Sequence, residues 1–89
     1  MGADKIIYLT RSISDDELEE IFKTLDMNFS RQTWGYSTEL DVSPTNEGLH
    51  LHYAYWGRDH AENAHHRTRQ IIRELRKKGL LKKIGRWCY

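Results

Sequence analysis

The chain is poor in cysteine, proline and methionine, and it has no long apolar run. Its 89 residues include one cysteine, one proline and two methionines. The single thiol, Cys88, cannot form a disulfide within the chain, so we expect a reducing, cytoplasmic compartment. No stretch of about twenty apolar residues is present, and no basic segment leads into an apolar one. These absences predict a soluble protein with neither a membrane span nor a secretory signal.

The length fits one small domain, and we take residues 1–89 as a single unit. A domain of this size buries roughly 60% of the surface that its unfolded chain exposes, so its core is modest. No internal repeat, low-complexity tract or linker divides the chain.

The net charge of +1 conceals a strong asymmetry between the two halves of the chain. Residues 1–45 carry nine acidic and four basic side chains, which gives −5. Residues 46–89 carry four acidic and ten basic side chains, which gives +6. Such a basic segment is typical of a surface that binds a polyanion, most simply nucleic acid, although a solvated helix face has the same composition.

Apolar residues recur with helix or strand periodicity in six segments. These are a strand over residues 5–10, a helix over 14–26, strands over 34–42 and 49–55, a helix over 59–78 and a last strand over 82–89. Ser14 and Glu17 form a capping box at the start of the first helix, and Gly79 is suited to end the second. The order β-α-β-β-α-β predicts an α+β fold, the ferredoxin-like plait, with an antiparallel sheet and two helices on one face.

A histidine pair, His50 and His52, is the most informative motif. Residues two apart on a strand point to the same face, so both imidazoles lie together. The apolar residues between and beside them face the opposite way, toward the helices. We therefore expect the two histidines on the open face of the sheet, where a ligand has access.

Two carboxylates would lie near the histidines if the preceding turn, residues 43–48, reverses the chain at 45–46. Glu39 would then lie opposite His52, and Asp41 would lie opposite His50. Cross-strand neighbours are within side-chain reach of one another. Imidazole and carboxylate groups together bind divalent cations, so the hairpin predicts a metal site on the open face.

The same residues resemble the core of the HUH endonucleases. The match comprises residues 34–39 (WGYSTE) and 48–56 (GLHLHYAYW), and residues 6–10 (IIYLT) resemble the first motif of that superfamily. The family includes rolling-circle replication initiators and relaxases, whose nicking domains have a ferredoxin-like or RRM-like sheet. Membership would imply a protein of a mobile element, such as a plasmid or virus, that binds single-stranded or hairpin DNA.

The resemblance also implies a cofactor and a set of ligands. By that analogy Glu39, His50 and His52 would hold a divalent ion, Mn or Mg, and Asp41 would support them. The ion would polarise a scissile phosphate, and a tyrosine would attack to leave a 5′-phosphotyrosine.

The expected nucleophile is missing from its usual position. In the family a tyrosine lies on the helix after the histidine strand, whereas the predicted helix over 59–78 contains none. Tyr8, on the first strand, and Tyr89, the last residue, remain as candidates. The sequence leaves open whether the protein cleaves DNA.

Basic and aromatic residues downstream of the histidines are candidates for contact with nucleic acid, and in this hypothesis the basic second helix positions the strand. They are Trp56, Arg58, Arg69, Arg73, Arg76, Lys77, Lys82 and Lys83. The main alternative is a non-catalytic module on the same fold that binds nucleic acid or inhibits a protein, with incidental histidines. A homo-oligomeric structural protein is a third reading, and the oligomeric state is open.

Overall fold

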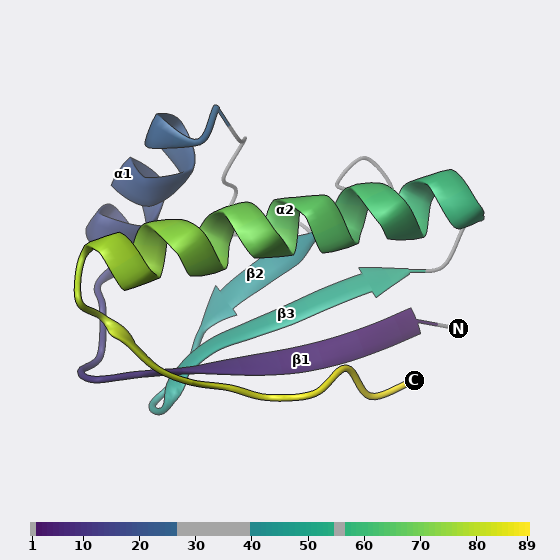
Figure 1. Cartoon of the computed structure of the whole chain (residues 1–89). Coiled ribbons are helices and arrows are strands. Elements are labelled where there is room, and N and C mark those ends of the chain that lie inside the picture. Colours follow the sequence, from purple (N-terminus) through teal and green to yellow (C-terminus); the bar gives the residue numbers. More distant parts are fainter. Residues whose placement is uncertain (1, 27–39, 55–56) are drawn as a thin grey trace.

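The structure is a computed structural model that describes residues 2–26, 40–54 and 57–89. Strands and helices follow one another in the predicted order, β-α-β-β-α-β (Figure 1). The elements are β1 (Gly2–Leu9), α1 (Asp15–Thr24), β2 (Asp41–Pro44), β3 (Gly48–Ala54), α2 (Arg58–Lys77) and β4 (Leu81–Ile84). Of the strand predicted over 34–42, residues 34–39 lie outside the described ranges.

The four strands form one antiparallel sheet in the order β2-β3-β1-β4. Both helices lie on the same side of this sheet, and α2 runs across it (Figure 1). The predicted α+β architecture, consistent with a ferredoxin-like plait, is confirmed.

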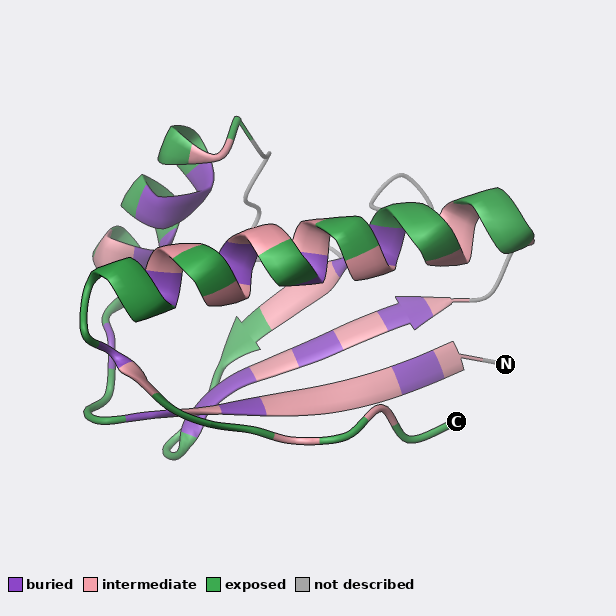
Figure 2. Ribbon diagram, in the orientation of Figure 1, coloured by how far each residue is buried: buried purple, intermediate pink, exposed green. Residues whose placement is uncertain are grey.

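The core lies between the sheet and the helices. Along β3, Leu49, Leu51 and Tyr53 are buried, while the alternating His50 and His52 are partly exposed (Figure 2). The buried stripe of α2 consists of Ala64, Thr68, Ile71 and Leu75, as the sequence periodicity predicts. The sheet face with the histidines is therefore the one that the helices leave uncovered.

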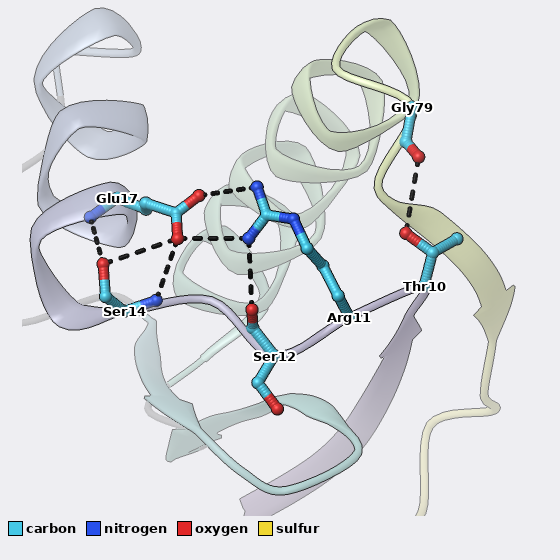
Figure 3. A network of polar contacts seen from close by, with 6 residues as sticks. All are labelled: Thr10, Arg11, Ser12, Ser14, Glu17 and Gly79. Atoms are coloured by element: carbon cyan, nitrogen blue, oxygen red, sulfur yellow. Dashed lines mark hydrogen bonds and ion pairs between the residues drawn. The ribbon is translucent and has the colours of Figure 1, made fainter.

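The start of α1 is fixed by local polar contacts. The hydroxyl of Ser14 accepts a hydrogen bond from the backbone N–H of Glu17 (3.2 Å), and the carboxylate of Glu17 accepts one from the backbone N–H of Ser14 (3.3 Å). Arg11 adds a two-pronged ion pair to the same carboxylate, at 2.8 and 3.1 Å (Figure 3). The predicted capping box is confirmed.

The end of α2 leads directly into the edge strand β4. Gly79 has a φ of 72°, a left-handed conformation that glycine adopts without strain. The backbone N–H groups of Gly79 and Leu80 donate to the carbonyls of Arg76 and Leu75, which terminates the helix. The chain then pairs with β1, first through β4 and finally through an isolated bridge between Cys88 and Asp4.

No helix in the described ranges is both long enough and apolar enough to cross a membrane.

Candidate functional site

A carboxylate from β1 joins the two histidines on the open face. The Oδ1 atom of Asp4 lies 2.9 Å from the Nε2 atom of His50 and 3.0 Å from the Nδ1 atom of His52. The strand order explains this contact, because β1 is the neighbour of β3 and Asp4 pairs directly with His52. The three side chains, called the Asp4 cluster below, are 34–49% exposed, so a ligand from solvent has access to them.

The predicted pairing of β2 with β3 is wrong by two residues. Asp41 lies opposite His52, and Ser43 lies opposite His50. The cause is a turn centred one residue further along the chain than expected, since Pro44 already pairs with Leu49 and residues 45–47 connect the two strands. Glu39 lies outside the described residues.

The side chain of Thr45 organises this turn. Its hydroxyl accepts hydrogen bonds from the backbone N–H groups of Glu47 (3.3 Å) and Gly48 (3.0 Å). The backbone N–H of Thr45 donates to the carbonyl of Gly48 at 2.8 Å. A threonine hydroxyl that accepts from the backbone N–H groups two and three residues further on stabilises a turn.

Side chains that can ligate metal form a row across the sheet. Asp41 pairs with His52, His52 pairs with Asp4, and Asp4 pairs with Cys88. The last pair exchanges two backbone hydrogen bonds, of 2.9 and 2.8 Å. Directly paired residues in an antiparallel sheet share a face, so these four side chains project from the open face.

A glycine provides room for one of the imidazoles. A Cβ atom at Gly2 would lie 2.7 Å from the Cε1 atom of His52 and 2.6 Å from the carbonyl oxygen of Tyr53. Both distances are shorter than ordinary van der Waals contacts. The absence of a side chain at Gly2 therefore allows the ring of His52 to lie over β1 and reach Asp4.

The cluster favours the ionised form of Asp4. Burial alone would raise the pKa of this carboxyl, but the hydrogen bonds from His52 and His50 and the electrostatic attraction of the two imidazoles together outweigh that effect. The net result is a pKa of Asp4 below its ordinary value. A negative charge at this position stabilises either two imidazole N–H donors or a bound cation.

The residue types of the Asp4 cluster are suited to a divalent cation, but their arrangement in this structure is not. Two imidazoles and a carboxylate are common ligands of first-row transition metals. The Oδ1 atom lies 2.9 Å from one nitrogen and 3.0 Å from the other, so the carboxylate itself occupies the point on which the two imidazoles converge. In the described parts of the chain no group of three or more His, Cys, Asp or Glu side chains is arranged to hold an ion. Binding would require the exposed imidazole rings to turn.

The two candidate tyrosines have different environments. Tyr8 lies on β1 opposite Gly48 and Lys83, and its ring is 5.8 Å from the Nζ atom of Lys83. Its position two residues from Ile6, the partner of His50, puts Tyr8 on the open face beside the cluster. Tyr89 is 86% exposed at the end of the chain.

The basic residues predicted to bind nucleic acid are exposed wherever the structure describes them. This holds for Arg58, Arg69, Arg73, Arg76 and Lys77 of α2 and for Lys82 and Lys83 of β4, whereas Trp56 lies outside the described residues. The arginines of α2 lie on the side of the helix opposite its buried stripe. The sheet therefore separates them from the histidines.

Another histidine, His65 of α2, lies on the helix side of the sheet. Its Nε2 atom is 3.1 Å from the hydroxyl oxygen of Tyr53, and its ring packs edge-on against Trp87 with centroids 5.1 Å apart. Burial lowers the pKa of His65, and the nearby charges of Arg69 and Lys5 lower it further. The contacts among His65, Tyr53 and Trp87 attach the C-terminal segment to both α2 and β3.

Asp4 is not among the residues predicted for the site, because the apolar run that predicts the first strand begins at residue 5. Alternation along residues 2–9 was the available signal. Ala3, Ile7 and Leu9 are buried, and Asp4 lies on the alternate face. Together with the strand order of a plait, which makes β1 the neighbour of β3, this pattern would have brought Asp4 to the histidines.

We found no match for this chain among protein family models, curated protein sequences or solved structures.

Proposed function

We propose that this chain is a divalent-cation-binding domain that binds single-stranded DNA across the open face of its sheet, in the manner of the HUH nicking domains. The observation that supports this proposal best is the Asp4 cluster. It combines two imidazoles and an ionised carboxylate on an accessible sheet face.

His50, His52 and Asp4 are the residues that would hold the cation, with Asp41 beside His52 as a further carboxylate. Mn²⁺ and Mg²⁺ are the ions we propose. The cation would withdraw negative charge from the oxygens of a phosphate that approaches this face. In its present contacts Asp4 orients both imidazoles, a role that carboxylates commonly have next to metal-bound histidines.

Side chains suited to contact a single DNA strand lie along β1 and β4. Tyr8 offers an aromatic ring on the open face, and stacking of a base on such a ring contributes about 1–3 kcal/mol. Lys83, next to Tyr8, offers a positive charge for a phosphate. These contacts are largely independent of sequence, so we propose binding with weak sequence preference.

Tyr8 also gives reason to test for nicking. Of the tyrosines in the described ranges, Tyr53 is buried beneath the helices and Tyr89 ends the chain, whereas Tyr8 shares the open face with His50. In such a reaction its hydroxyl oxygen would bond to phosphorus, its proton would pass to solvent, and the 3′ oxygen of the preceding nucleotide would leave. We propose Tyr8 as the first residue to test for a covalent adduct.

The test is a titration of Mn²⁺ and Mg²⁺ into the wild type and into the His50→Ala/His52→Ala variant, with a labelled single-stranded oligonucleotide pool. Uptake of metal and DNA binding that are lost together in the variant would support the proposal. His66→Ala is the matched control, because His66 is an exposed histidine of α2 on the other side of the sheet. A denaturing gel of wild type and Tyr8→Phe reports adducts.

The alternative, a non-catalytic module with incidental histidines, makes the opposite prediction. DNA binding would then persist in the double variant and in the presence of a chelator. A result of this kind, with no metal uptake by the wild type, would overturn the metal site and leave the open face as a binding surface.

A further inference from the structure

The outer side of α2 carries a row of arginines. Arg69, Arg73 and Arg76 are all exposed, and their spacing of four and three residues aligns them along one side of the helix. Glu74 is the acidic residue of this half of the helix, and it contacts Lys77 at 4.0 Å. The row therefore retains a net positive charge.

Positive charge continues where α2 turns into β4. Leu81 pairs with Leu9 and Lys83 pairs with Tyr8, so Lys82 is an extra residue in a β-bulge. Both lysines are exposed, and Arg86 follows them as an exposed residue of the C-terminal segment. Bulges in edge strands twist the strand and redirect its side chains.

These six exposed basic residues follow one another along the chain from α2 through β4 to the C-terminal segment, and together they are called the basic band. Its members, in order, are Arg69, Arg73, Arg76, Lys82, Lys83 and Arg86. Figure 1 shows the backbone that carries these residues, since the end of α2 leads down into β4 at the edge of the sheet. Within this band Lys83 is beside Tyr8, which lies on the same face as His50.

We infer that one single strand of nucleic acid binds along this whole band, passing round the β4 edge from the outer side of α2 to the Asp4 cluster. This inference rests on the proposed function, because it extends the path of the strand that the open face would bind. A single bound strand would connect the arginine row of α2 with the Asp4 cluster, which lie on opposite sides of the sheet.

The shape of the path selects the ligand class. The Cα atoms span 33 × 24 × 20 Å, so a nucleic-acid backbone that contacts both sides of the sheet must reverse direction within about this distance. Duplex DNA, with a persistence length of about 500 Å, resists such a bend. A single strand follows it easily, and arginine side chains bind phosphate in a bidentate manner. The occupant is therefore a flexible single strand rather than a duplex.

The test compares oligonucleotide lengths and salt dependence. The probes are single strands of about 6 and about 20 nucleotides, which bracket the roughly 4–16 nucleotides that small single-strand-binding domains cover. The proteins are the wild type, Arg69→Ala/Arg73→Ala/Arg76→Ala, and Lys82→Ala/Lys83→Ala. Lys23→Ala is the matched control, because Lys23 is an exposed base on α1, outside the band.

For the long probe, we expect the triple variant to reduce the slope of log affinity against log salt by about 2, at about 0.7 per phosphate contact. For the short probe, which the open face alone can hold, we expect the triple variant to have little effect. The lysine variant should weaken both probes, and Lys23→Ala should weaken neither.

Other outcomes overturn the inference in distinguishable ways. If both probes bind and the triple variant leaves the affinity and salt dependence of the long probe unchanged, the arginines of the band do not contact the strand. Binding at the open face would then still be supported. Equal or tighter binding of a duplex, lost in the triple variant, would make α2 a separate duplex site. Failure of the wild type to bind either probe would refute the proposed function itself.

Discussion

The Oδ1 atom of Asp4 lies 2.9 Å from the Nε2 atom of His50, although 46 positions separate the two residues in the chain. The sheet order makes this contact possible, because β1 lies beside β3 rather than beside β2. The same oxygen lies 3.0 Å from His52. One carboxylate thus determines the orientation of both imidazoles on which the proposed metal site depends.

Replacement of Asp4 tests this role. We expect Asp4→Asn to lower the affinity for Mn²⁺ by about 10–100-fold, the usual cost of losing a carboxylate that orients or supplements metal ligands. Stability should change by less than about 1 kcal/mol, because the ion pairs are half exposed. Calorimetric titration measures the first quantity and urea unfolding the second. Unchanged affinity would remove Asp4 from the site.

Adjacent residues of β3 should differ sharply in their contribution to stability. Leu51 is fully buried beneath the helices, so Leu51→Ala should reduce the free energy of unfolding by about 2–5 kcal/mol. His52→Ala, on the open face, should change it by no more than about 1 kcal/mol. Urea unfolding of both variants compares the two faces directly. Similar losses at both positions would contradict the assignment of the open face.

The capping box should contribute measurably to α1. We expect Ser14→Ala to reduce the free energy of unfolding by about 1 kcal/mol, because the backbone N–H of Glu17 loses its acceptor. Ser12→Ala is the control, since Ser12 is exposed and precedes the cap. Equal effects of the two substitutions would argue against the cap.

Stability should fall in mild acid through His65. The pKa of this residue is lowered in the folded state, so the unfolded chain binds a proton first as the pH falls. The contribution is fully present above the ordinary histidine pKa of 6.5 and declines as the pH drops below it toward the lowered value. Urea unfolding between pH 8 and about 5 should show a loss that is smaller in His65→Gln. An identical pH profile in that variant would contradict the prediction.

Much of the fold could be predicted because its determinants are local. The Ser14 cap, the Gly79 terminus and the buried stripe of α2 each depend on residues within a few positions of one another. Strand alternation likewise predicts which face carries His50 and His52.

The contacts of the site were harder to predict because they depend on pairing between strands. A turn fixed by the hydroxyl of Thr45 moved Asp41 opposite His52. Asp4 lies in the first, more polar half of β1, whereas the strand was predicted from the apolar residues of its second half. Glu39, the carboxylate predicted from the hairpin, falls outside the described residues.

The two ends of the described chain converge on the Asp4 cluster. Gly2 underlies the ring of His52, and Cys88 is hydrogen-bonded to Asp4. Any sequence fused to either end is therefore held near the cluster at an effective concentration that a short linker raises to the millimolar range. A polyhistidine tag would compete there with the proposed metal site for added metal, whereas a tethered fluorophore would test whether the proposed ligands bind at this face.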